Sequence, residues 1–162
     1  MPLELFRIDD RLIHGQVVVG WGQPMRLGFI VLVDDEVASS EWERELYRMG
    51  VPPEVDVVFE TVDGAAARIE EFAKDPRPGI LLTGDVESMA RLAERCGRVR
   101  TVNLGGIHHR AGRMQKLRYV FLAPDEEGAL RALEQTGIAV TAQDVPGARP
   151  VPLSDVLAGK GE

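Results

Sequence analysis

Short apolar runs alternate with helix-like segments along almost the whole of this 162-residue chain. Between the apolar runs lie segments with polar caps and apolar residues at helical spacing. This alternation predicts an α/β fold: a doubly wound, mostly parallel open sheet with helices on both faces, in three layers. No linker or repeat interrupts the pattern, so we expect one domain over residues 1–162. The predicted strands are 3–8, 28–33, 55–59, 80–82, 99–104, 119–122 and 138–140, and the clearest predicted helices are 41–49, 63–72, 86–95 and 124–135.

Polar residues and glycines predict where several elements begin and end. Ser39 or Ser40 can cap the helix that Gly50 ends, and Asp63 can cap the next helix. The segment 107–118 has the least regular pattern. We expect 138–140 to be the last strand, followed by a Pro- and Gly-rich tail with a short helix at 154–157.

Composition and charge exclude several classes of function. The longest apolar run, 29–33, is far too short to span a bilayer. The start of the chain lacks a signal-peptide pattern, and a single cysteine, Cys96, provides neither a disulfide nor a metal framework, so we expect a cytoplasmic protein. The formal net charge of −7 argues against general nucleic-acid binding.

The first predicted strand is followed directly by a loop rich in charged groups. The stretch reads Arg-Ile-Asp-Asp-Arg-Leu-Ile-His-Gly-Gln-Val over residues 7–17, and 17–21 predicts a short helix. In parallel α/β sheets, ligands bind beyond the carboxyl ends of strands, where helix N-termini point outward. The loop is therefore suited to meet an anion.

This stretch closely resembles the phosphorylation-site signature of the mannose/fructose/sorbose-family IIB component of the bacterial phosphoenolpyruvate-dependent sugar phosphotransferase system. The similarity continues through most of the chain. Its further residues are Gly20-Trp21, Val33 to Ala38, Pro52-Pro53, Asn103 to Gly106 and Val145-Pro146.

The resemblance implies a function and its partners. The histidine that matches His14 would take a phosphoryl group on Nδ1 from the phosphohistidine of a mannose-type IIA protein. It would pass that group to a sugar held by the membrane components IIC and IID, as a protein-Nπ-phosphohistidine–sugar phosphotransferase without a cofactor. The protein would then sit at the inner membrane through its permease partners. A regulatory phosphoprotein with the same His14 chemistry but no sugar transport is the alternative.

The residue types of the loop fit phosphoryl transfer. Neutral imidazole is a nucleophile near pH 7, and a helix N-terminus next to His14 would favour both the neutral ring and a bound phosphoryl group. The backbone N–H groups of Gly15, Gln16 and Val17 are candidate phosphate donors, and a residue without Cβ at 15 allows close approach. The planar guanidinium of Arg11 suits phosphate oxygens.

Two acidic residues of the loop are candidates for orienting the histidine ring. We predict Asp10 as a functional acid and Asp9 as a residue lining the site. Which of them accepts a hydrogen bond from the ring stays open, because either can instead form a salt bridge with Arg7 or Arg11.

Three further strand ends reach the same edge of the predicted sheet. Asp34 and Asp35 can line the site or cap a turn. Asn103, Gly105 and Gly106 can approach the first loop or a ligand, or form a plain turn. We predict no metal site, because the adjacent His108 and His109 would point to opposite sides of an extended chain.

A segment without acidic residues runs from 95 to 124, and its arginines and lysine could steer an acidic partner. Neutralisation by acids elsewhere in the fold is the alternative, and we favour a docking role only for Arg110 and Arg113. A receiver-type signalling domain fits poorly, since Glu60 or Thr61 rather than Asp follows the third strand. No nucleotide-binding glycine motif occurs.

Overall fold

The computed structural model describes residues 3–161 and contains a seven-stranded, largely parallel sheet with strand order β3-β2-β4-β1-β5-β8-β9. Only β9 pairs antiparallel to its neighbour among these strands. A separate antiparallel hairpin is formed by β6 and β7. The strands are β1 Leu3–Ile8, β2 Phe29–Val33, β3 Asp56–Glu60, β4 Gly79–Thr83, β5 Thr101–Leu104, β6 Met114–Leu117, β7 Val120–Leu122, β8 Ala139–Ala142 and β9 Val151–Pro152.

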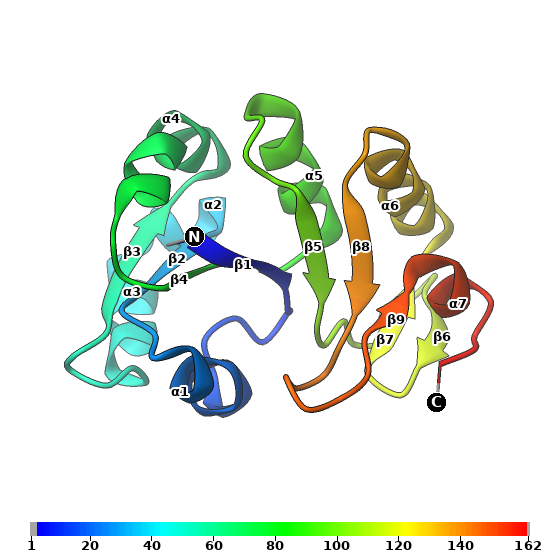
Figure 1. Ribbon diagram of the computed structural model, residues 1–162, viewed down its shortest axis with the longest axis horizontal. Helices are drawn as coiled ribbons and strands as arrows, with labels where there is room; N and C mark the ends of the chain where they lie inside the picture. The colour runs from blue at the N-terminus through cyan, green and yellow to red at the C-terminus, as the bar shows by residue number, and fades with distance from the viewer. Residues whose placement is uncertain (1–2, 162) are drawn as a thin grey trace.

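Helices cover both faces of the sheet, as the alternating pattern predicts. In Figure 1, α4 lies above the strands β2 and β4, and α1 lies below them. One apolar core contains buried residues of α4, α5 and α6, and the other contains buried residues of η1 and α2. The helices are η1 Gln16–Trp21 (a π-helix), α1 Gly22–Met25, α2 Asp35–Ala38, α3 Glu41–Met49, α4 Val62–Lys74, α5 Val86–Arg95, α6 Pro124–Gln135 and α7 Leu153–Leu157.

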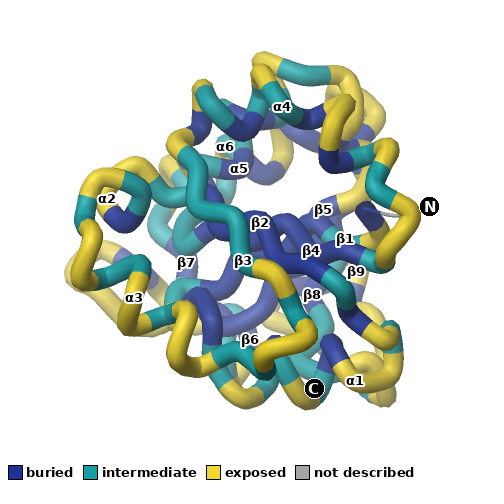
Figure 2. Tube along the Cα trace, turned by 90° about the vertical axis from the view of Figure 1, so that its left-hand side faces the viewer, coloured by how far each residue is buried: buried dark blue, intermediate teal, exposed yellow. Residues whose placement is uncertain are grey.

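The strands at the centre of the sheet are buried on both sides. Every residue of β2 and β4 is buried, which explains their continuous apolar sequences (Figure 2). Strand β1 lies between β4 and β5, with Ile8 opposite Thr83 and Leu104. Its carboxyl end therefore opens into the middle of one sheet edge, and the loop that follows has neighbours on both sides.

Several local expectations need correction. Helix α4 is capped by the Thr61 side chain rather than by Asp63, and Asp34 caps an additional short helix, α2. The predicted strand 119–122 exists but pairs with β6 outside the main sheet. Strand β8 is not the last, because β9 returns beside it. Antiparallel hairpins and two-residue strands carry no helical connection, so the alternation of elements does not reveal them.

The remaining predicted elements are confirmed to within a few residues. Helix α3 begins after the Ser40 cap, and α5 and α6 have the expected bounds. Across residues 3–161, no helix combines the length and apolar character that crossing a membrane requires.

Candidate functional site

The loop between β1 and η1 turns sharply at the edge of the sheet. Its start is held on both sides, because the Asp9 N–H donates to the Thr83 carbonyl and the Asp10 N–H donates to the Gly106 carbonyl. Leu12 adopts φ +60°, and its N–H donates to the Asp9 carbonyl at 2.9 Å. The Leu12 side chain is buried, which stabilises this unusual backbone conformation through packing.

Arg7 is a fully buried cation beneath this loop. Its Nη1 donates to the Asn103 side-chain oxygen and to the Gln143 carbonyl at 2.9 Å, and its Nη2 donates to the Asp144 carbonyl at 3.2 Å. The guanidinium also lies 5.0 Å from the centre of the Trp21 ring. A buried charge is tolerated only when it is paired, so these contacts make Arg7 a fixed positive charge under the site.

The Asp9 carboxylate lies between the side chains of Arg7, Arg11 and His14. Its Oδ2 lies 3.4 Å from Arg7 Nη2, 3.2 Å from Arg11 Nη2 and 3.2 Å from His14 Nε2. Its Oδ1 accepts the backbone N–H and the Nε–H of Arg11. Burial by itself raises the pKa of Asp9, but the adjacent His14 ring, the hydrogen bonds from Arg11 and the charge of Arg7 outweigh burial and hold this pKa well below its usual range. Asp9 is therefore ionised at neutral pH.

His14 presents its two ring nitrogens to different environments. Nε2 is buried against Asp9, at a distance of 3.2 Å but off the line of a well-aligned hydrogen bond. Nδ1 accepts the backbone N–H of Gln16 at 3.2 Å. This arrangement favours the proton on Nε2 and a lone pair on Nδ1. The side chain is 18% exposed, so one edge of the ring remains accessible.

The backbone amides at the start of η1 are partly engaged already. The Val17 and Val18 N–H groups donate to the His14 carbonyl, at 3.1 and 3.0 Å, and the Gln16 N–H faces the ring. A Cβ added at Gly15 would meet no atom within 4 Å, so no contact of this structure requires glycine there.

Arg11 connects the Asp9 carboxylate to the Gln16 side chain. Arg11 Nη2 donates both to Asp9 Oδ2 and to Gln16 Oε1. The Arg11 side chain is 36% exposed. A guanidinium that is oriented by a buried anion and still open to solvent can bind an incoming phosphoryl group next to His14.

The glycine pair after β5 closes the site from the other side. A Cβ at Gly105 would lie 2.7 Å from Asp9 Oδ2 and would also collide with the Arg7 guanidinium. At Gly106 it would lie 3.2 Å from Arg11 Nη2 and 3.3 Å from His108 Cε1. The first loop thus approaches the backbone of this turn closely, and Asn103 on the preceding strand binds Arg7.

Asp10 points away from His14 and fixes a neighbouring loop. Its carboxylate accepts the backbone N–H of His108 at 2.7 Å and faces His108 Nδ1 at 2.5 Å. Of the two acids between which the sequence could not choose, Asp9 is the one beside the His14 ring. Asp10 instead ties the first loop to the turn that carries His108.

The acids at the end of β2 are engaged elsewhere. Asp34 accepts the Val37 N–H as the cap of α2. Asp35 accepts the Val62 N–H and pairs with Arg91, and these partners lower the pKa of its carboxyl. Both residues stabilise helix starts, and among residues 3–161 neither forms a hydrogen bond or ion pair with the His14 loop.

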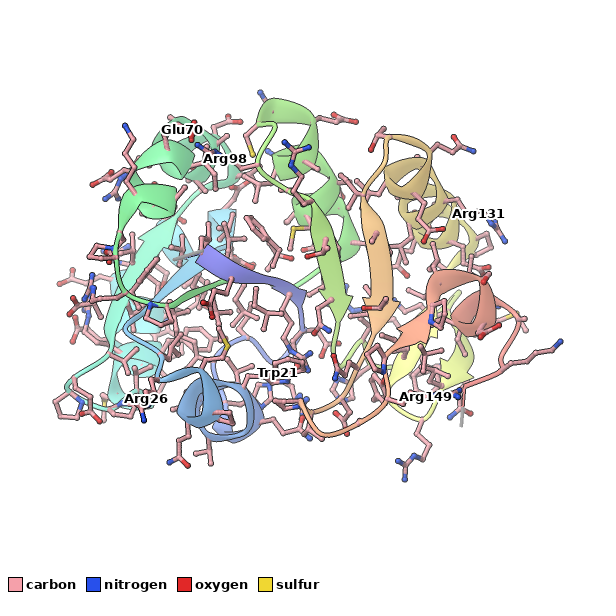
Figure 3. The ribbon with its side chains drawn as sticks, viewed as in Figure 1. Trp21, Arg26, Glu70, Arg98, Arg131 and Arg149 are labelled. Carbon is pink, nitrogen blue, oxygen red and sulfur yellow. The ribbon has the colours of Figure 1, made fainter. Side chains whose placement is uncertain are left out.

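Most of the basic segment is neutralised by acids from other elements. Arg113 is buried and donates to both carboxylate oxygens of Glu126 and to the His108 carbonyl, so it cannot be the docking residue that we favoured. Figure 3 shows Arg98 meeting Glu70 at the end of the molecule opposite Trp21. The ion pairs are Arg95–Asp63, Arg98–Glu70, Arg113–Glu126 and Lys116–Glu127.

Sequence reasoning offered Arg7 only as an alternative salt-bridge partner of Asp9 or Asp10, and it assigned no role to the carbonyls of Gln143 and Asp144. An arginine at an inward position of an otherwise apolar strand is the signal that could have revealed a buried charge. The carbonyls carry no sequence signal, because every residue has one. The Trp21 Nε1–H also donates to the Asp144 carbonyl at 3.1 Å.

The architecture and this loop define a three-layer α/β domain of the kind found in sugar phosphotransferase IIB proteins. The IIB domain of the sorbose permease from Klebsiella pneumoniae superposes with a TM-score of 0.85 at 29% identity, over 98% of this chain and 97% of that chain.

Sequence comparison gives the family directly. The chain belongs to the sorbose subfamily of phosphotransferase-system (PTS) IIB components, whose family model matches residues 3–162. It is 30% identical to the sorbose-specific EIIB component of Klebsiella pneumoniae, over 85% of this chain and 84% of that protein. It is also 30% identical to the mannose-specific EIIAB component of Escherichia coli strain K12, over 98% of this chain and 49% of that protein. PTS IIB components are phosphotransferases in sugar transport.

Proposed function

We propose that this protein is a phosphocarrier that accepts a phosphoryl group on His14 Nδ1 and transfers it to a sugar during uptake. The observation that carries the proposal is the division of the His14 ring between two partners. Asp9 occupies the Nε2 side, and among residues 3–161 the Nδ1 lone pair accepts only the Gln16 backbone N–H. Nδ1 is therefore the nucleophilic nitrogen of the ring, and the Gln16 N–H would turn from Nδ1 to a phosphoryl oxygen as the lone pair attacks.

The first step transfers the phosphoryl group between two histidines and needs no other reactant. The Nδ1 lone pair of His14 attacks the phosphorus carried by a IIA phosphohistidine, and the N–P bond of the donor breaks. The bonding pair returns to the donor nitrogen, so no proton has to move on His14, whose Nε2 keeps its hydrogen. The Asp9 anion stabilises the positive charge that develops on the ring.

The surrounding groups bind the phosphoryl oxygens. Arg11 offers a planar cation that Asp9 already orients, and the Gln16 N–H lies 3.2 Å from Nδ1. Binding a phosphate oxygen would replace the contact between Arg11 and the Gln16 side chain. The absence of a Cβ at Gly15 would then leave room for the phosphoryl group.

In the second step a sugar hydroxyl oxygen attacks the phosphorus and releases its proton to water, while the N–P bond breaks and returns its electron pair to Nδ1. The donor would be a mannose-type IIA protein, and the sugar would be held by membrane components IIC and IID, which keep the protein at the inner membrane. The name EIIAB of one relative, of which this chain matches about half the length, supports a IIA partner.

Reconstitution tests the proposal. The protein is mixed with the general phosphotransferase proteins, labelled phosphoenolpyruvate and a mannose-type IIA, and the labelled peptide is mapped by mass. We expect acid-labile, alkali-stable label on His14 and its transfer to sugar when IIC and IID vesicles are added. Label on an aspartate, or none at all, contradicts the proposal. Label on His14 that vesicles never discharge to any sugar supports a regulatory phosphoprotein instead.

A further inference from the structure

A second histidine, His108, lies at the same edge of the sheet and is oriented by a carboxylate. Asp10 Oδ1 lies 2.5 Å from the His108 ring Nδ1, and Asp10 Oδ2 accepts the His108 backbone N–H at 2.7 Å. The Asp10 side chain is only 14% exposed, whereas the His108 side chain is 58% exposed. A carboxylate beside Nδ1 favours the proton on that nitrogen and leaves the lone pair on Nε2. Among residues 3–161, this Nε2 has no hydrogen-bond partner.

The backbone that carries this ring is held from behind. The His108 carbonyl accepts Arg113 Nη1 at 2.8 Å, and Arg113 is itself buried and paired with Glu126. The preceding residue, Ile107, exchanges two backbone hydrogen bonds of 2.8 Å with the β6–β7 hairpin. The fold therefore fixes both the backbone and the ring of His108.

The His108 ring shares its surroundings with Arg11. A Cβ at Gly106 would lie 3.2 Å from Arg11 Nη2 and 3.3 Å from His108 Cε1, so both side chains reach the same point over this backbone. Cε1 is bonded to both ring nitrogens, and Nδ1 is taken by Asp10, so the free Nε2 is the next atom of the ring. Arg11 in turn lies against Asp9, which contacts the His14 ring. A free imidazole nitrogen thus lies close to the cation that would bind the phosphoryl group.

The adjacent histidine, His109, has a different environment. Its ring packs edge-on against the Phe121 ring, with the two ring centres 5.7 Å apart. Of the two neighbouring histidines, His108 is the one that a carboxylate orients. His109 therefore provides a matched control for the chemistry of His108.

The second transfer step needs a group that accepts the proton of the sugar hydroxyl, and the residues nearest the phosphoryl group are poorly suited to it. In phospho-His14, Nδ1 carries the phosphoryl group and Nε2 already carries a hydrogen. The Asp9 side chain is fully buried beneath its partners, so a sugar cannot reach it. Arg11 is a cation without a lone pair to offer. The exposed Nε2 of His108 has the lone pair that these groups lack.

We propose that His108 is the general base of the sugar-transfer step. Its Nε2 lone pair takes the hydroxyl proton while the hydroxyl oxygen bonds to phosphorus, and the N–P bond breaks and returns its electron pair to His14 Nδ1. The resulting imidazolium is stabilised by the Asp10 carboxylate at Nδ1, so Asp10 is a positioning residue, and the proton reaches water only afterwards. The inference rests on the proposed function, because it adds a proton acceptor to the transfer from phospho-His14.

The test measures the two transfer steps separately in a His108→Ala variant. Phosphorylation of His14 by IIA is followed without membranes, and transfer from phospho-His14 to sugar is followed with vesicles that contain the cognate IIC and IID proteins. The first step moves no proton, so its rate should be unchanged. The sugar step should slow by about two orders of magnitude or more, the usual contribution of a general base. Imidazole added to the solution should restore part of the lost rate, because it supplies the missing proton acceptor.

Two further variants sharpen the comparison. His109→Ala should leave both steps unchanged. Asp10→Asn keeps one acceptor oxygen but loses the charge that stabilises the imidazolium, so it should slow the sugar step less than His108→Ala does. Circular dichroism checks that each variant is folded.

The outcomes distinguish the base from other roles of His108. A normal sugar step in the His108→Ala protein overturns the proposal. Equal slowing of both steps assigns His108 to phosphate binding or to contact with IIA, and a slow sugar step that imidazole does not restore assigns it to the structure of the loop; both results reject the base.

Failure of the proposed function gives a different result. If the wild-type protein takes no label on His14, the phosphocarrier itself is rejected and this inference falls with it. If His14 takes label and passes it to sugar at a rate independent of His108, only the inference is rejected.

Discussion

The Asp9 carboxylate lies 3.2 Å from His14 Nε2, and the opposite ring nitrogen accepts the Gln16 N–H. The same carboxylate also binds Arg7 below it and Arg11 above it. One buried anion therefore fixes the orientation of the nucleophile and the position of its neighbouring cation. Changes in Asp9 should alter both.

Replacing His14 by alanine should abolish labelling by phospho-IIA and leave the fold intact, because the side chain packs at the surface edge of the loop. The measurement is transfer of labelled phosphate, with circular dichroism as the check on folding. His109→Ala is the control and should label normally. Label that persists in the His14→Ala protein would reject His14 as the phosphorylated residue.

Asn at position 9 should keep the size of the side chain but remove its charge. Arg7 would then be a buried cation without its carboxylate, and we expect the free energy of unfolding to fall by about 3 kcal/mol or more. Transfer to His14 should also fall, because Nε2 loses the anion that stabilises the charged ring. Denaturant unfolding and single-turnover transfer measure the two effects. Unchanged stability would mean that the carbonyls of Gln143 and Asp144 suffice for Arg7.

The low pKa of Asp9 predicts a pH dependence of stability. A carboxyl whose pKa is lower in the folded than in the unfolded state stabilises the fold above its unfolded value, which is about 3.9 for Asp, and loses that contribution as pH falls further. The difference in unfolding free energy between the wild type and Asp9→Asn should therefore be constant near neutrality and shrink below about pH 4. A difference independent of pH down to about pH 2 would show that Asp9 is not specifically stabilised as an anion.

Arg11→Ala should slow phosphoryl transfer by about two to three orders of magnitude, the usual effect of removing one group that stabilises transition-state charge. The fold should change little, since this side chain is partly exposed. Lysine should restore only part of the rate, because it lacks the planar fork. Near-normal transfer by the alanine variant would make Arg11 a structural partner of Asp9 only.

Gly105→Ala should displace the Asp9 and Arg7 side chains that support His14. The added methyl group would lie 2.7 Å from Asp9 Oδ2, and both Asp9 and Arg7 are too tightly held to move freely. We expect lower stability by about 1–3 kcal/mol and slower transfer. Gly128→Ala on α6 is the matched control, because a Cβ there meets no atom within 4 Å, and it should not reduce stability.

The sequence predicted the sheet, its buried central strands and the His14 loop because each depends on local patterns of polarity and turn residues. It could not choose between Asp9 and Asp10, since adjacent side chains differ only in the direction the turn gives them. The positive φ of Leu12 helps to determine that direction, and leucine is not a residue type from which a positive φ is predicted. The interpretation of Arg113 as a docking residue failed for a related reason: its partner Glu126 comes from α6, beyond the stretch that lacks acidic residues.

The contacts of Arg7 also determine at which stage of chain synthesis the site can be completed. The carbonyls that hold this first-strand cation belong to Gln143 and Asp144, more than 130 residues further along the chain. A nascent chain emerging from the ribosome at about 5–20 residues per second can pair β1 with its neighbours well before these carbonyls exist. The charged base of the site is therefore completed only when nearly the whole chain has been synthesised. Fragments that end before residue 143 would lack the completed site.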